Sequence, residues 1–146
     1  NRSISTRVST STKISSGKAN LGIKLIEPVK GVITGRYADI SSVRSSAHTG
    51  LDIAAPRGTK ISAAASGTVV FAGTKGSFGK MVVISHGNGV QTYYAHCSSL
   101  LVSKGDTVKQ GQAIAKVGKT GNATGNHLHF EVRVNGQSYN PQKYIY

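Results

Sequence analysis

Apolar and polar residues alternate in short runs along most of the chain, which is the pattern of strands with one buried face. The clearest example predicts a hairpin, with one strand over 81–85, a turn over 86–89 and a second strand over 90–96. The turn contains Asn88 and Gly89, which favour the tight connections of hairpins. We therefore expect neighbouring strands to pair in antiparallel fashion.

Further strands are expected where the alternation returns, at 68–72 and within 106–118 and 127–139. The last of these contains Asn135 and Gly136, which predict another tight turn. Only the segment 98–104 is expected to carry a helical turn. Short strands joined by tight turns predict an all-β fold of mainly antiparallel sheets, packed as a two-layer sandwich.

The first part of the chain lacks this pattern. Nine of the first 16 residues are Ser or Thr, and no acidic residue occurs before Glu27. Such a segment buries too little apolar surface to fold, so we predict a basic linker or tail over 1–20 and one folded domain over 21–146. The early charges are not followed by the apolar stretch of a signal peptide. We expect the chain to be a fragment of a longer precursor.

Composition and charge exclude several classes of protein. No run of 18 apolar residues occurs, so no membrane span is expected, and the single cysteine, Cys97, excludes an internal disulfide. Eighteen Lys and Arg against five Asp and Glu give a net charge of +13, which attracts nucleic acid, anionic lipid or an anionic cell wall. Because the basic residues occur mostly singly and aromatic residues make up only 6%, we expect no nucleic-acid partner.

The histidines and aspartates are the candidate chemical groups. His48 and Asp52 flank Gly50, and in extended chain residues four apart lie about 13 Å apart. They could reach one metal ion only if the chain bends, which Gly50 allows. His127 and His129 would project from one face of a strand with Cα atoms about 7 Å apart. Two such imidazoles can hold a metal together, or one can hold it while the other acts on substrate.

Three further side chains are of types that can carry chemistry: His86, His96 and Cys97. His96 ends the predicted strand 90–96, and taken alone it is more often a satisfied polar residue. His86 lies in the predicted turn, where a structural role is favoured. Cys97 follows His96, and adjacent strand residues face opposite sides, so a small buried apolar residue is favoured over a Cys–His nucleophile pair.

Three motifs occur in a fixed order along the chain: H-x-x-x-D at 48–52, Y-A-H at 94–96 and H-L-H-F-E at 127–131. With these motifs, about 26–146 resembles the LytM/lysostaphin-type zinc endopeptidases, which cleave peptidoglycan peptides. The resemblance implies that Zn²⁺ is held by His48, Asp52 and His129. It also implies that His96 and His127 form the catalytic pair beside the metal.

The implied activity is zinc-dependent hydrolysis of stem or cross-bridge peptides of bacterial peptidoglycan, in the cell wall or secreted. No H-E-x-x-H motif supplies a glutamate base, so His96 and His127 would share the proton transfers, with either one as the base. The positive charge suits anionic cell-wall polymers as a further partner. The alternative is a zinc-bound but non-hydrolytic module that binds the wall or serves as a scaffold.

Overall fold

The computed structural model describes residues 21–37, 50–121, 123 and 125–145. Its strands are β1 (Val32–Gly35), β2 (Leu51–Ala54), β3 (Lys60–Ser62), β4 (Gly67–Thr74), β5 (Lys80–Gly87), β6 (Val90–Leu100), β7 (Thr107–Val108), β8 (Ala113–Val117), β9 (His127–Val134) and β10 (Gln137–Tyr139). Helical structure within the described part is limited to a 3₁₀ turn (Gly76–Phe78) and helix α1 (Gln142–Ile145). Neither is long and apolar enough to cross a membrane. The all-β prediction is confirmed.

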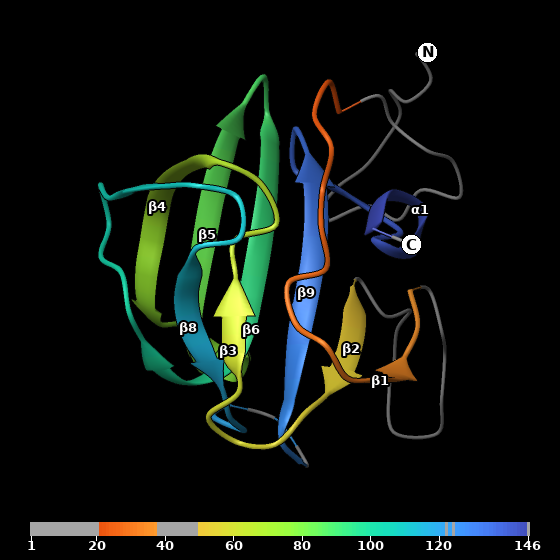
Figure 1. The fold of residues 1–146 in the computed structure, drawn as a ribbon, viewed down its shortest axis with the longest axis vertical. Helices are drawn as coiled ribbons and strands as arrows, with labels where there is room; N and C mark the ends of the chain where they lie inside the picture. Colours follow the sequence, from red (N-terminus) through yellow and green to blue (C-terminus); the bar gives the residue numbers. More distant parts are fainter. Residues whose placement is uncertain (1–20, 38–49, 122, 124, 146) are drawn as a thin grey trace.

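The described strands pair in antiparallel fashion throughout. The main sheet has the order β1-β2-β9-β6-β5-β4-β7, with β10 on β9, while β8 joins β3 to β6. In Figure 1, β3 and β8 lie in front of β4, β5 and β6. The strands therefore form two layers, as the alternation of apolar residues predicts.

Strand β6 belongs to both layers. Its first half, through Ala95, pairs with β9, and its second half, from Cys97 to Leu100, pairs with β8. The pairing with β5 is interrupted at the same place, because β6 has one more residue than β5 between two successive partner pairs. Such a bulge bends a strand and increases its twist. The chain thus passes from one layer to the other at His96.

Strand β9 separates the core from an open face of the main sheet. Leu128, Phe130 and Val132 are fully buried in the core. The alternating residues point to the other face, because successive side chains of a strand lie on opposite sides. That face carries His127, His129, Glu131 and Arg133, and cross-strand pairing places a second, smaller apolar cluster beside them: Met81, Val83 and Ala95, with Phe71, Phe78 and Tyr93 against it.

Local predictions for the hairpin and the helical turn have different outcomes. The hairpin is confirmed, with longer strands than expected; Asn88 and Gly89 have φ of 54° and 79°, as a tight hairpin turn requires. The helical turn expected over 98–104 is wrong. Ser99 and Leu100 continue β6, because pairing with β8 satisfies their backbone in an extended conformation.

Candidate metal and catalytic site

The site lies at one end of the open face, where β2 and β9 run side by side (Figure 1). Asp52 of β2 is the cross-strand partner of His129 of β9, and Ala54 is the partner of His127. The Asp52 carboxylate lies 2.8 Å from Nδ1 of His129 and 3.7 Å from Nε2 of His127. Strand register therefore brings one carboxylate against two imidazoles.

His129 is held from behind by a buried carboxylate. Its Nε2 lies 2.7 Å from Oε2 of Glu131, whose side chain is fully buried. A carboxylate only accepts hydrogen bonds, so both ring nitrogens carry protons here: Nε2 donates to Glu131, and Nδ1 donates to Asp52. Burial lowers the pKa of His129, but the hydrogen bonds to Asp52 and Glu131 outweigh burial and raise the pKa to about 9.

Glu131 in turn is neutralised by Arg133, two residues further along the same face. The Nε and Nη2 atoms of Arg133 lie 2.6 and 2.5 Å from Oε1 of Glu131. The guanidinium rests on the ring of Tyr93, 4.3 Å from its centroid. A buried carboxylate is expensive unless it is paired and hydrogen-bonded, and both of its oxygens are satisfied here.

His96 occupies the bulge of β6 with φ of 64°. This left-handed conformation costs a non-glycine residue about 1–3 kcal/mol, which the pairing on both sides of the bulge must offset. Its ring lies 4.9 Å from that of His127 and 6.0 Å from that of His129, centroid to centroid. Burial lowers the pKa of His96, and the nearby His127 and His129 lower it further.

The two rings of His96 and His127 are oriented alike. Nδ1 of His96 donates to the carbonyl of Thr120 at 2.8 Å, and Nδ1 of His127 donates to the carbonyl of Gly125 at 3.0 Å. A carbonyl oxygen can only accept, so both Nδ1 atoms carry protons. Nε2 is therefore the reactive nitrogen of each ring, whereas His129 offers Nδ1.

The loop behind His96 is fixed by close backbone contacts. Thr120 Oγ1 donates to the Cys97 carbonyl at 2.7 Å and accepts from the Lys80 amide at 3.0 Å. Gly79 has φ of 66°, and a Cβ there would lie 2.4 Å from the backbone of Thr120. Phe78, on the same turn, has its ring centroid 6.0 Å from that of His129. The turn and the loop thus pack together at the edge of the site.

Four of the five predicted site residues converge at this place: Asp52, His96, His127 and His129. The fifth, His48, lies outside the described residues, so the bend at Gly50 that would bring it to Asp52 has no test here. Gly50 is itself a bend residue, and a Cβ would lie 2.5 Å from the Phe130 carbonyl.

The side chains expected to be structural fit that expectation. Cys97 is fully buried, and burial raises the pKa of its thiol to about 12, so it is no nucleophile. His86 bonds the Ser66 carbonyl and the Thr92 hydroxyl at 2.7 and 2.8 Å. The sequence interpretation missed Glu131 and Arg133 as supports of the site. The strand period could have found them, since both share a face with His127 and His129.

The described donors suit zinc in type and orientation. Zinc binds imidazole nitrogen and carboxylate oxygen, and Nδ1 of His129 and Oδ1 of Asp52 converge. Glu131 is the outer carboxylate that metal-binding histidines commonly have. Within the described part of the chain, no group of three or more His, Cys, Asp or Glu side chains could hold a metal ion by itself. The third ligand that the resemblance implies, His48, lies outside that part.

Comparison with known proteins places this geometry in a family context. The sequence profile of peptidase family M23 matches residues 46–141. The DD-carboxypeptidase/endopeptidase Mpg of Neisseria meningitidis is 51% identical over 94 residues, which are 64% of this chain and 22% of that protein. The murein hydrolase activator NlpD of Escherichia coli is 37% identical over 112 residues, 76% of this chain and 29% of that protein. The chain thus spans less than a third of either relative.

Solved structures share the fold. A zinc-containing peptidase from Vibrio cholerae superposes with a TM-score of 0.75 at 33% identity, covering 81% of this chain and 39% of that one. The catalytic domain of lysostaphin from Staphylococcus simulans superposes with a TM-score of 0.68 at 32% identity, covering 79% of this chain and 90% of that one.

Proposed function

This chain belongs to peptidase family M23, and from that premise we propose that it is a zinc-dependent endopeptidase acting on the peptides of bacterial peptidoglycan. The observation that carries the proposal is the opposite orientation of the imidazoles. His129 offers Nδ1 beside Asp52, whereas His96 and His127 offer Nε2. One set of groups is thus suited to hold a metal and the other to exchange protons.

In this proposal His48, Asp52 and His129 hold the zinc ion. When bound, zinc polarises the scissile carbonyl and lowers the pKa of a water molecule at the site toward neutrality. Glu131 holds the Nε2 proton of His129, so the proton that zinc would displace is the one on Nδ1, which here donates to Asp52.

Proton transfer falls to His96 and His127. With each Nδ1 proton committed to a backbone carbonyl, both rings gain and lose protons at Nε2. One ring accepts the proton of the attacking water, and the other donates a hydrogen bond to the oxyanion that forms on the peptide carbonyl. The lowered pKa of His96 favours the neutral ring that a base requires.

The location follows from the proposed substrate, and the domain bounds follow from the sequence pattern. We place the domain outside the cytoplasm, where peptidoglycan lies, and assign the peptidase domain to 21–146. Residues 1–20 are assigned to a linker or tail, which lies outside the described residues.

The test is mass spectrometry of purified peptidoglycan after incubation with the protein, with zinc and with a chelator. New peptide termini that appear only with zinc are expected, and they name the bond that is cut. His127→Ala serves as the control, since it removes one of the two proton-transfer groups.

A second candidate is a zinc-bound module without hydrolytic activity. It is supported by the similarity to NlpD, which is described as an activator of hydrolases. Zinc bound at one ion per chain without new termini in any peptidoglycan would favour this candidate. The side chains present at positions 52, 96, 127 and 129 favour the enzyme.

A further inference from the structure

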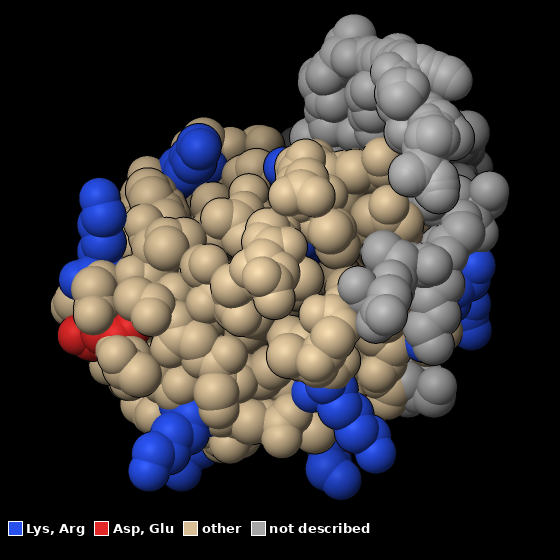
Figure 2. All heavy atoms as spheres, turned by 90° about the horizontal axis from the view of Figure 1, so that it is seen from above, with Lys and Arg blue, Asp and Glu red and all other residues tan. Residues whose placement is uncertain are grey.

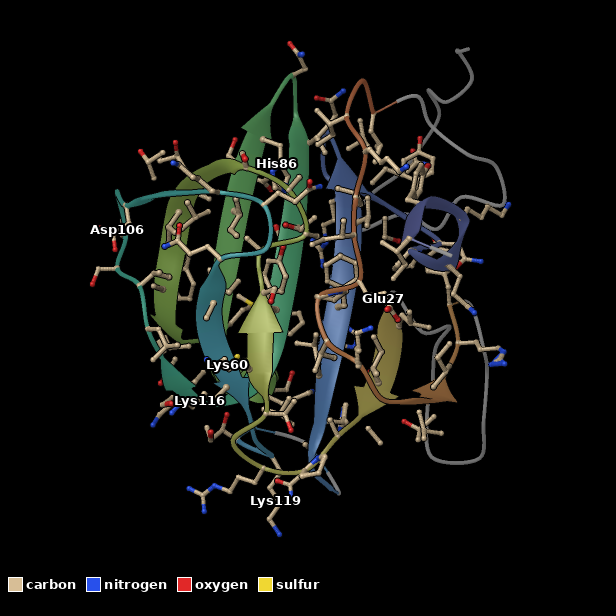
Figure 3. All side chains as sticks on the ribbon, viewed as in Figure 1. Glu27, Lys60, His86, Asp106, Lys116 and Lys119 are labelled. Carbon is tan, nitrogen blue, oxygen red and sulfur yellow. The ribbon has the colours of Figure 1, made fainter. Side chains whose placement is uncertain are left out.

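Five basic side chains surround the end of the small layer next to His127. We name this set the basic strip: Arg57, Lys60, Lys80, Lys116 and Lys119. Lys60 of β3 and Lys116 of β8 are direct cross-strand partners. The Gly58 amide bonds the Val117 carbonyl, which brings Arg57 to the same strand end. Figure 3 shows Lys60, Lys116 and Lys119 near one another at the lower end of the molecule.

Backbone contacts connect the basic strip to the site. Gly118 bridges to His127, so Lys119 immediately follows the residue that pairs with a site histidine. The Lys80 amide bonds Thr120, whose carbonyl holds His96. The Lys80 ammonium lies 3.2 Å from the Ser98 carbonyl, on the strand next to β8. Lys119 and Lys80 thus lie next to the site, whereas Lys60 and Lys116 lie on the outer face of β3 and β8, across the core from the face that carries the site histidines.

Four side chains of the basic strip are exposed and Lys116 is half-buried, and their charges lack an acidic partner among the described residues. Ile61 and Ala115 of the same two strands are fully buried, so Lys60 and Lys116 point outward. Ion pairs among the described residues involve only the carboxylates of Asp52 and Glu131, and none includes a member of the strip.

Like charges directly opposite each other destabilise a sheet, so the pairing of Lys60 with Lys116 costs stability. Figure 2, which views the molecule from the end opposite Lys119, shows Lys and Arg in separate groups around the edge of that view. An open groove of about 630 Å³ begins at Lys60, and Lys30 and Glu27 also line it.

We propose that the basic strip binds carboxylate groups of peptidoglycan that lie outside the peptide being cut. The partner follows from the proposed function, on which this inference rests: a polymer whose peptide enters at His127 passes Lys119 and continues around the end of the two layers to the pair of Lys60 and Lys116. Carboxylates of the neighbouring peptides then supply the anions that the strip lacks.

The experiment compares two charge-matched double variants. Lys60→Gln with Lys116→Gln removes the centre of the strip, and Lys104→Gln with Lys109→Gln removes two exposed charges elsewhere. Binding to insoluble peptidoglycan is measured by sedimentation at low salt, with His127→Ala in every protein so that the polymer stays intact. The strip variant is expected to bind about 3- to 10-fold more weakly than its parent, and the control within about twofold.

A second arm identifies the anion. When the carboxyl groups of the peptidoglycan are converted to amides, the parent and the strip variant are expected to bind equally. Equal losses in both double variants would mean that only total charge counts, and would overturn the proposal. It would also fail if the difference persisted on amidated peptidoglycan and soluble polyphosphate competed for the strip, because the ligand would then be a phosphate polymer.

Folding and hydrolysis are followed separately. The strip variant is expected to melt at the same temperature as its parent or higher, since it removes a like-charge pair. Peptide release by the proteins that retain His127 tests the proposed function independently. If the strip variant binds peptidoglycan more weakly but the wild type releases no peptides, the proposed hydrolase activity would be contradicted, whereas the proposed binding surface would stand.

Discussion

Glu131 connects the fold to the metal site, and its replacement gives the sharpest test of the site geometry. Glu131→Ala removes the acceptor for the Nε2 proton of His129 and leaves Arg133 without its partner. The imidazole of His129 is then free to carry its proton on Nδ1, the nitrogen required for zinc. Glu131→Gln is the matched control, because its amide oxygen can still accept from Nε2 although it gives up the ion pair with Arg133.

Two costs must be separated. Loss of an outer carboxylate typically weakens metal binding about 10- to 100-fold, or about 1.4–2.7 kcal/mol. Breaking a buried ion pair costs about 3–5 kcal/mol of folding stability, a large part of the usual total of about 5–15 kcal/mol. Both variants lose the pair with Arg133, so both are expected to melt at lower temperature. Only Glu131→Ala is expected to lose zinc affinity by tenfold or more.

The assay is zinc competition against a chromophoric chelator, at a temperature where circular dichroism shows each variant to be folded. Nitrogen-15 chemical shifts of the His129 ring report which nitrogen carries the proton. An affinity of folded Glu131→Ala within threefold of the wild type would refute the reasoning, as would a Glu131→Gln variant that loses as much affinity as the alanine variant.

The other predictions concern proton transfer, pH and the loop behind His96. His96→Ala is expected to retain one zinc per chain and to release peptides at least about 100-fold more slowly than the wild type, whereas His129→Ala is expected to lose the metal. Elemental analysis measures the zinc content, and mass spectrometry measures peptide release. A His96→Ala variant without zinc would contradict the assignment of roles. Burial lowers the pKa of His86 below its usual 6.5, so the stability that its neutral ring provides is fully present above pH 6.5 and is lost as pH falls below it. Between pH 8 and pH 5 the melting temperature of the wild type is expected to fall more steeply with decreasing pH than that of His86→Gln. Melting temperatures that fall in parallel for the two proteins would contradict this. Gly79→Ala places a Cβ 2.4 Å from the Thr120 backbone at a φ of 66°, and is expected to lower the free energy of unfolding by about 1–3 kcal/mol. It is also expected to slow peptide release, because it displaces the carbonyl that orients His96. Unchanged turnover would contradict this role of the loop.

Strand alternation was enough to predict the fold class and the shared face of His127 and His129. The run from His127 to Val134 has its apolar residues in the core and its polar residues on the open face, as the period of two requires. The convergence of His127 and His129 with Asp52 depends on the register of β2 against β9, which no local pattern contains. The motif order supplied that relation through resemblance.

Other features were beyond the local pattern for physical reasons. The apolar run at Leu100–Val102 has no clear period, so the sequence alone does not distinguish a helical turn from a strand. Pairing with β8 fixes the extended conformation of Ser99 and Leu100. The ring orientations of His96 and His127 depend on carbonyls of distant loop residues, Thr120 and Gly125 in the fold. The strand period places Glu131 on the face of His127 and His129, but its complete burial there depends on the packing of neighbouring strands.

The passage of β6 between the layers has a consequence for how activity arises during folding. Because His96 sits where the strand leaves β9 and joins β8, neither layer alone can hold its backbone in the left-handed conformation. A chain in which only the main sheet has formed would have His129 and Asp52 in register but no fixed proton acceptor. Catalytic competence should therefore appear only in the last cooperative step of folding, and amide exchange at His96 and Cys97 should be as slow as global unfolding. If the chain has the proposed function, it would not act on peptidoglycan until both layers had closed.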